Sequence, residues 1–314
     1  MSLNPPARIL IALGGNALIS HTQRGTYEEQ LETVGATASI LVNLIEQGYE
    51  LVLTHGNGPQ VGNLLLQHAA AADQVPVLPM DVCGAQSQGQ IGYLFAQQLR
   101  NELLSRNIST EVTAVVTQVV VDQTDPAFKH PTKPVGPFYS ESEIEQFKSK
   151  GFVYTEDAGR GFRRVVPSPE PKAIVELPAI QMLSKKHIVI ATGGGGVPVI
   201  KTERGYRGVE AVIDKDKASA LLAAELAVDA FIILTGVSQV ALNFNTPEQK
   251  NIAEVSCTDA RKYIKEGHFA PGSMLPKIEA AVTFVTETGK AALITNPNSL
   301  VESFAGTVGT WVTE

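Results

Sequence analysis

Four glycine-rich turns, each following a short apolar run, constrain the fold of this chain more than any other feature of its sequence. The turns occupy residues 12–17, 54–62, 192–198 and 235–236. Glycine has no Cβ, so its amide can approach a ligand closely and take backbone angles that other residues avoid. Amides of this kind beside helix N-termini bind anions. The pattern therefore predicts a protein that handles phosphate at more than one place.

The apolar runs before these turns predict an α/β fold. Residues 9–13 are apolar and end at the first glycine turn, helical periodicity follows up to Gly48, and residues 51–53 lead into the second turn. A strand, a helix and a strand in this order imply parallel neighbours joined by a right-handed crossover. Further strands are expected at 188–191, 231–234 and 291–294. Because fully apolar strands are covered on both faces, we predict a sheet with helices on each side.

Helices are predicted between these strands, in segments that are rich in Ala, Leu, Gln and Glu. They span residues 60–72, 87–104, 216–227 and 275–288. In a doubly wound sheet the ligand crevice lies beyond the carboxyl ends of the strands, which is where the glycine turns fall. The expected topology and the expected phosphate chemistry therefore indicate the same edge of the sheet.

One proline-rich stretch, residues 124–171, interrupts this rhythm. Prolines cluster toward both of its ends, and charge is concentrated at 156–157 and 160–164. Proline lacks a backbone donor and restricts the residue before it, which excludes a central strand. An ordered loop of this length is usually functional. We therefore expect a single domain over residues 1–314 with a protruding subdomain, or flap, inserted at 124–171.

Composition favours a folded protein without a general attraction to polyanions. The 25 Lys and Arg against 32 Asp and Glu give a net charge of −7, so neither nucleic acid nor an anionic membrane is expected as a partner. No apolar run approaches the ~20 residues of a membrane span, and no signal-peptide pattern is present. Cys83 and Cys257 form neither a disulfide framework nor a CxxC site. These features predict a cytoplasmic protein.

Several common nucleotide-binding motifs are absent from the sequence. Gly56, Gly58 and Gly62 approach a dinucleotide fingerprint, but the third glycine falls one residue late. Neither a Walker loop nor the protein-kinase set of motifs occurs. None of the seven tyrosines is followed four residues later by lysine, as a short-chain dehydrogenase would require. A kinase of this sequence would therefore belong to neither of those classes, and hydride transfer is disfavoured.

Phosphoryl transfer needs positive charge beside the transferred group, and three lysines stand in unusual contexts. Lys133 lies between two prolines, and Lys215 lies between two aspartates at a predicted helix start. Lys277 falls in the first turn of another predicted helix, where a cation opposes the helix dipole by about 0.3 to 1 kcal/mol, so we expect an anionic partner. The alternative for each lysine is a solvated surface charge. Asp216 is a candidate to orient the lysines or to take part in Mg²⁺ binding, and the alternative is a helix N-cap, a role that could coexist with either.

The six histidines show no metal-ligand pairing, and no metal site built by the protein is predicted. His55, beside Gly56, is expected to form a turn-stabilising hydrogen bond rather than to touch substrate. Cys83 is expected to be a packing residue.

Taken together, eight segments resemble the carbamate kinases, a branch of the amino acid kinase family. In the order of that family they are 12–17 (ALGGNA), 55–62 (HGNGPQVG), 131–138 (PTKPVGPF), 156–161 (EDAGRG), 165–169 (VVPSP), 193–199 (GGGGVPV), 208–216 (GVEAVIDKD) and 267–277 (GHFAPGSMLPK). The segments extend over nearly the whole chain, and the resemblance is highly specific.

The resemblance implies an open αβα sandwich with a mainly parallel central sheet, a protruding subdomain and a homodimer. It also implies an ATP:carbamate phosphotransferase that uses Mg²⁺ and is usually run toward ATP, from carbamoyl phosphate and ADP. Our hypothesis is a direct in-line transfer without a covalent enzyme intermediate, with flap closure excluding water.

Matched positions imply roles for individual residues. Lys215 and Lys277 would flank the phosphoryl group, Lys133 would reach in from the flap, and Asp216 would organise the lysines. Contacts to carbamate and the phosphoryl group would come from Gly14, Gly15, Asn16, Gly56, Asn57, Gly58, Gly194 and Gly195. Nucleotide contacts would come from Asp214, Thr235, Gly236, Val237, Met274 and Pro276.

One position departs from the wider family. Many amino acid kinases place a lysine two residues before the first glycine pair, whereas this chain has Ala12. The difference matches the carbamate kinase branch, where Lys215 takes that role, and argues against an N-acetylglutamate or aspartate kinase. Two alternatives stay open: a kinase for another small carboxylate, and a nucleotide-sensing regulator that has lost turnover. The three lysines and Asp216 speak against the regulator.

Overall fold

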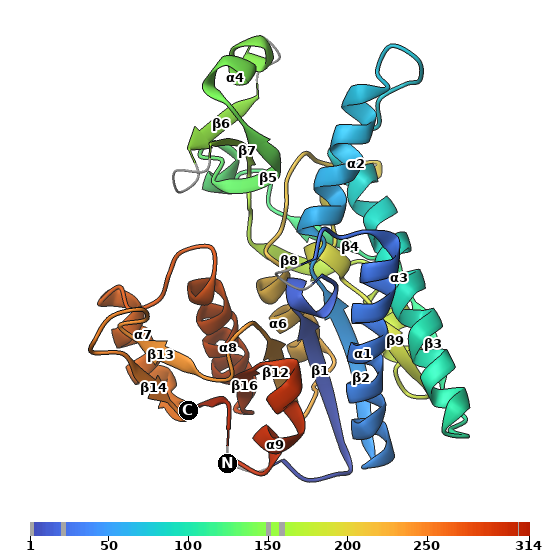
Figure 1. The fold of residues 1–314 in the computed structure, drawn as a ribbon, viewed down its shortest axis with the longest axis vertical. Helices are drawn as coiled ribbons and strands as arrows, with labels where there is room; N and C mark the ends of the chain where they lie inside the picture. Colours follow the sequence, from blue (N-terminus) through green and yellow to red (C-terminus); the bar gives the residue numbers. More distant parts are fainter. Residues whose placement is uncertain (1–2, 20–22, 149–151, 157–160, 307) are drawn as a thin grey trace.

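An eight-stranded, mainly parallel sheet forms the centre of the molecule in a computed structural model, which describes residues 3–19, 23–148, 152–156, 161–306 and 308–314 (Figure 1). Its strands, in spatial order, are β15 (Glu254–Ser256), β17 (Thr310–Thr313), β16 (Ala292–Thr295), β12 (Ala230–Leu234), β1 (Ala7–Leu13), β2 (Tyr49–His55), β9 (His187–Ile190) and β3 (Glu111–Ala114). Within the described residues, the pair β16 and β17 is antiparallel and the other pairs are parallel. The predicted fold class is therefore confirmed.

The strands alternate their side chains between two apolar layers. Leu10 and Ala12 of β1 face a core shared with α6 (Lys215–Glu225) and α8 (Met274–Thr288). Ile9 and Ile11 face a second core shared with α1 (Tyr27–Glu46) and α3 (Met80–Ser105). A strand with both faces buried carries no polar positions, which explains the continuous apolar runs in the sequence. The expectation of helices on both sides of the sheet is confirmed, and the arrangement is a three-layer αβα sandwich (Figure 1).

A helix lies close to each of the segments where one was predicted, namely after the first strand and at residues 60–72, 87–104, 216–227 and 275–288, whereas the remaining helices were not predicted. The helices are α1 (Tyr27–Glu46), α2 (Gly58–Ala70), α3 (Met80–Ser105), α4 (Glu141–Lys148), α5 (Leu177–Leu183), α6 (Lys215–Glu225), α7 (Cys257–Lys265), α8 (Met274–Thr288) and α9 (Leu300–Phe304). Helix α3 begins seven residues before the predicted start, because burial of Met80 and Cys83 compensates for a glycine in its second turn.

The proline-rich insertion forms a small antiparallel sheet that stands above the main sheet, beside α2 (Figure 1). Its strands are β5 (Lys133–Tyr139), β7 (Phe162–Val166) and β6 (Val153–Glu156), with α4 following β5. Residues 149–151 and 157–160 of the predicted insertion, which include part of the 156–161 segment, lie outside the described residues. We keep the name flap for residues 124–171; its status as a separate subdomain stays a prediction.

Two further sheets join the flap and the C-terminal part to the core. One contains β11 (Gly205–Gly208), β10 (Val197–Thr202), β4 (Gln118–Val121) and β8 (Pro171–Ile174), and the other pairs β13 (Val240–Leu242) with β14 (Lys250–Ile252).

Among the helices of the described ranges, none combines the length and apolar character needed to cross a membrane.

Candidate active site

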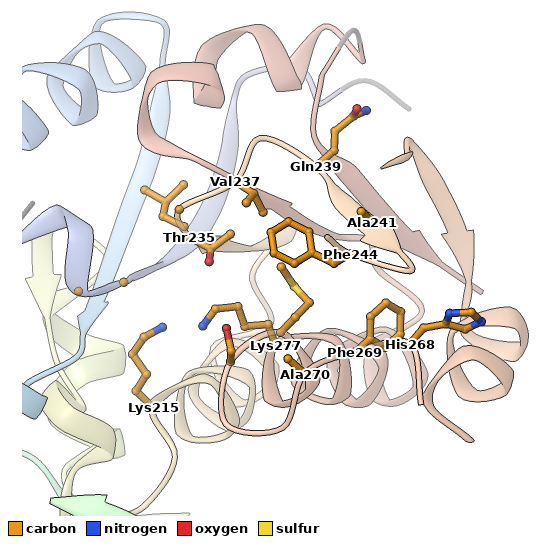
Figure 2. A pocket seen from close by; sticks show the side chains of 16 residues that line it. Lys215, Thr235, Val237, Gln239, Ala241, Phe244, His268, Phe269, Ala270 and Lys277 are labelled. Atoms are coloured by element: carbon orange, nitrogen blue, oxygen red, sulfur yellow. The ribbon is translucent and has the colours of Figure 1, made fainter. Parts of the chain in front are cut away.

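Two cavities meet at Lys215, beyond the carboxyl ends of the central strands. The larger, of about 370 Å³, lies beyond β1 and β12 and extends along α8 (Figure 2). The smaller, of about 150 Å³, lies beyond β2 and is closed on one side by β5 of the flap. Both are lined in part by Lys215, so a ligand in either cavity would contact the same side chain.

Three charged side chains form the centre of the site. Asp216, in the first turn of α6, accepts hydrogen bonds from Lys215 Nζ and from Lys277 Nζ, the second over 2.9 Å. Lys277 lies in the first turn of α8, and α6 packs against α8, which brings both lysines to one carboxylate. Figure 2 shows the ammonium ends of Lys215 and Lys277 directed toward the same region. The anionic partner expected for Lys277 is thus Asp216.

The electrostatics of this triad favour a bound anion. Burial raises the pKa of the Asp216 carboxyl, but the ammonium groups of Lys215 and Lys277 outweigh burial and hold that pKa well below its usual range. Burial also lowers the pKa of Lys215, Asp216 opposes this effect, and the positive charge of Lys277 adds to it. An anion between the ammonium groups would raise the pKa of Lys215 again, so anion binding and protonation of this lysine support each other.

Asp214 occupies the helix-capping position that the sequence analysis had considered for Asp216. The N-cap of α6 is Asp214, whose Oδ1 accepts a hydrogen bond from the backbone N–H of Asp216 over 2.9 Å. The N-cap alternative for Asp216 is therefore wrong, and its carboxylate is engaged with lysines instead. The second oxygen of Asp214 accepts a hydrogen bond from Lys133 Nζ of the flap over 2.7 Å.

Close approach of another side chain requires glycine at one position of the small cavity, Gly194. Gly194 has φ +65°, and a Cβ on it would lie 2.1 Å from Asn57 Nδ2. Asn57 Nδ2 donates a hydrogen bond to Ser87 Oγ over 2.8 Å, which fixes its side chain. Helix α2 begins at Gly58 with no side-chain cap among the described residues, so the N–H groups of its first turn, apart from Pro59 which has none, are available to an anion. The small cavity thus combines backbone donors with the ammonium groups of Lys133 and Lys215.

The large cavity has an apolar wall that sequence reasoning missed. Phe244, from the loop between β13 and β14, and Phe269, before α8, line it opposite the glycines of the first turn. Phe244 stands between two asparagines with positive φ, Asn243 at +50° and Asn245 at +64°. An aromatic residue flanked by two turn-forming asparagines is the signal that could have identified this wall.

The structure brings most of the predicted site residues to the two cavities. Gly14, Gly15, Thr235, Gly236, Val237, Met274 and Lys277 line the large one, and Gly56, Asn57, Gly58, Lys133 and Gly194 line the small one. Pro276, Asp214, Asp216 and Gly195 are not among the described residues that line either cavity, although Asp216 contacts Lys215 and Lys277, which do. The side chain of Asn16 lies outside the described part of the structure.

His55 and Cys83 are structural residues. His55 is buried, and its Nδ1 donates a hydrogen bond to the carbonyl oxygen of Gly56 over 2.9 Å, as the turn-stabilising interpretation predicted. Burial lowers the pKa of His55 to about 4. Cys83 is fully buried in α3, which agrees with its predicted packing role.

Comparisons with known proteins agree with this geometry. Residues 7–296 match the amino acid kinase family. The chain is 52% identical over 311 residues to a carbamate kinase of Thermococcus kodakarensis, covering 97% of this chain and 98% of that protein. It is 49% identical over 311 residues to carbamate kinase 2 of Staphylococcus epidermidis, covering 98% and 99%.

Solved structures extend the comparison to the fold. A carbamate kinase from Giardia lamblia bound to AMP-PNP has a TM-score of 0.92 at 42% identity, covering 100% of this chain and 99% of that one. An N-acetylglutamate synthase from Neisseria gonorrhoeae has a TM-score of 0.60 at 15% identity, covering 98% of this chain and 59% of that one, and shares the fold alone.

Proposed function

The chain belongs to the amino acid kinase family, and from this premise we propose that it is a carbamate kinase, an ATP:carbamate phosphotransferase. One observation carries the proposal: two lysine ammonium groups share the carboxylate of Asp216 at the point where a large and a small cavity meet. Identity of about 50% to carbamate kinases over nearly the full length supports the choice of substrate.

The sizes and linings of the cavities support an assignment of the two substrates. We assign ATP or ADP to the large cavity, where Val237 and Met274 offer apolar contacts and Thr235 and Gly236 follow β12. The family resemblance adds Asp214 and Pro276 to the nucleotide contacts. We assign carbamate or carbamoyl phosphate to the small cavity, between the turns at Gly56–Gly58 and Gly194–Gly195. Gly14, Gly15 and Asn16 would hold the phosphoryl group that passes between the two.

The proposed reaction is a direct in-line transfer. In the direction of ATP synthesis, an oxygen of the ADP β-phosphate attacks the phosphorus of carbamoyl phosphate, and the bond from phosphorus to the carbamate oxygen breaks. Carbamate leaves with that electron pair. Lys215 and Lys277 neutralise charge on the equatorial oxygens, and Lys133 approaches from the flap. Asp216 keeps the two core lysines at a fixed separation, so their charge needs little reorganisation during the transfer.

Magnesium fits this site as a partner of the nucleotide. Within the described residues, no three His, Cys, Asp or Glu side chains gather as a metal site, and both oxygens of Asp214 and of Asp216 are engaged. Mg²⁺ in kinases is commonly held by substrate phosphates and one or two carboxylates. We propose that it arrives on the nucleotide phosphates, while Asp216 stays engaged with Lys215 and Lys277. When bound, it would neutralise charge on the phosphate oxygens.

A coupled assay of ATP formation from carbamoyl phosphate and ADP tests the proposal. We expect ATP formation that depends on Mg²⁺, and no comparable ADP formation from ATP with N-acetylglutamate. Faster turnover with N-acetylglutamate would favour a kinase of another carboxylate. Nucleotide binding without turnover on either substrate would favour a regulator.

Assembly and location complete the proposal. The family resemblance implies a homodimer, so light scattering should give about twice the chain mass of 33.5 kDa. The proposed location is the cytoplasm, which fractionation of the source cells would test.

A further inference from the structure

The flap rests on the core through a contact between two glycines, Gly62 of α2 and Gly136 of β5. A Cβ built on Gly62 would lie 3.1 Å from Gly136 Cα and 3.4 Å from its amide nitrogen. Gly136 itself has φ +72°, in the left-handed region that favours glycine. Helix α2 and strand β5 therefore approach more closely than a side chain on Gly62 would allow.

Other contacts fix the same part of the flap to the core. Val135 of β5 and Val166 of β7 are buried with Met80 of α3 in a small apolar cluster. The backbone N–H of Val212 donates a hydrogen bond to the carbonyl oxygen of Pro167 over 2.9 Å. The first residues of β5 thus form an anchored stem, distinct from the outer part of the flap that carries α4.

Lys133 lies at the start of this stem, three residues before the glycine contact. Its ammonium group reaches 2.7 Å from Asp214 Oδ2, and its side chain lines the small cavity together with Gly56 and Lys215. Since the stem is fixed on α2, the separation between α2 and β5 determines how far Lys133 extends over that cavity.

We propose, building on the proposed function, that Gly62 is a positioning residue for Lys133. The missing side chain at Gly62 lets β5 lie against α2, and this close approach brings the Lys133 ammonium to Asp214 and to the anion held in the small cavity. Gly62 belongs to the glycine turn at residues 54–62, but it lines neither cavity among the described residues, so this role is separate from ligand contact.

The variant Gly62→Ala tests the inference, because its methyl group would shift β5 by a few tenths of an ångström. We expect kcat/KM for carbamoyl phosphate to fall about five- to tenfold, mainly through KM, with KM for ADP unchanged. Gly89→Ala is the matched control, since Gly89 is an exposed glycine of α3 whose added Cβ would meet nothing within 4 Å. It should leave both KM values within about twofold of wild type.

A double-mutant cycle separates positioning from a general loss of structure. In a Lys133→Ala background, Gly62→Ala should cause no further loss, because the lysine that it positions is gone. An equal loss in both backgrounds, or a Gly62→Ala variant with the kinetics of Gly89→Ala, would overturn the inference.

A second readout does not depend on activity. A double-mutant cycle of Lys133 and Asp214, measured by equilibrium unfolding, should give a coupling of about threefold in the unfolding equilibrium constant because of their ion pair. In the Gly62→Ala background this coupling should be abolished. If the wild-type chain forms no ATP from carbamoyl phosphate, the proposed function fails on its own. An unchanged coupling in the Gly62→Ala background would contradict the positioning role whatever the substrate.

Discussion

The two cavities that share Lys215 are built in contrasting ways. The large one is lined on one side by Phe244, Phe269 and Met274, which offer apolar surface and few charges. The small one is lined by glycines, Asn57 and two lysines, with backbone groups close to any occupant. The first suits a ligand recognised by its shape and ring faces, and the second suits a small anion recognised by hydrogen bonds and charge. Substitutions should therefore affect the two substrates separately, except at Lys215, which lines both cavities, and at its partners in the triad.

The largest effect is expected where the cavities meet. Lys277→Ala removes one of the two ammonium groups that we propose to flank the transferred phosphoryl group, so kcat should fall by about 10² to 10³, or 3 to 4 kcal/mol. Steady-state kinetics in the ATP-forming direction measure this fall in kcat. Lys217→Ala, in the same helix as Lys215 but paired with Glu170 outside both cavities, is the control. Near-normal turnover of Lys277→Ala would refute the role of the triad.

A methyl group in the small cavity should separate the two substrates. In Gly194→Ala the new Cβ meets Asn57 at a φ of +65°, so KM for carbamoyl phosphate should rise by about 30-fold, or 2 kcal/mol, with ADP affinity retained. Gly205→Ala supplies a control, because Gly205 has φ +117° but an added Cβ would meet nothing within 4 Å. Equal losses of affinity for both substrates would contradict the separation of the cavities.

The turn beside the small cavity, where His55 is hydrogen-bonded to the carbonyl oxygen of Gly56, should also respond to pH. Folding lowers the pKa of His55 from 6.5 to about 4, so the unfolded chain binds a proton first as pH falls. The stability associated with neutral His55 is present above about pH 6.5 and is lost toward pH 4, amounting to about 2 kcal/mol between pH 7.5 and pH 5. Urea unfolding should show that His55→Gln removes this part of the pH dependence, whereas His68→Gln in α2 keeps it. If the unfolding free energy of His55→Gln depends on pH as in the wild-type chain, His55 is excluded as the source of that dependence.

The smallest effect is expected at the apolar wall of the large cavity. Phe244→Ala should raise KM for ADP about fivefold, or 1 kcal/mol, and leave KM for carbamoyl phosphate unchanged. Tyr206→Ala, another exposed aromatic but on β11, should change neither value. A rise in KM for carbamoyl phosphate alone would reverse our assignment of the two cavities.

The central sheet was predictable because its physical causes are local in sequence. Residues 9–13 and 231–234 are apolar throughout because both faces of β1 and β12 are buried, and glycine follows β1 because a Cβ on Gly14 would lie 2.5 Å from the Leu234 carbonyl oxygen. The sequence also predicted that Lys277 would have an anionic partner, since a cation in the first turn of a helix needs an anion.

Other parts of the site depend on contacts that no local pattern encodes. Two aspartates flank Lys215, and either could cap a helix, so a shift of one or two residues in the helix start decides which one holds the lysines. Phe244 lines the large cavity only because the β13–β14 loop brings it to the same space as Met274 and Lys277 of α8. The contact between Gly62 and Gly136 joins segments separated by the whole of α3.

Three consecutive residues, Asp214, Lys215 and Asp216, connect to three separate destinations: the flap lysine, the junction of the cavities and the first turn of α8. The register of these three residues therefore determines where the charged groups at the centre of the site lie. A one-residue deletion or insertion there would rotate every connection by about 100° around the axis of α6 and misdirect all three at once. Loop grafting or circular permutation of this enzyme should leave residues 213–217 in register, while the hairpin between β10 and β11 offers a safer place for new sequence.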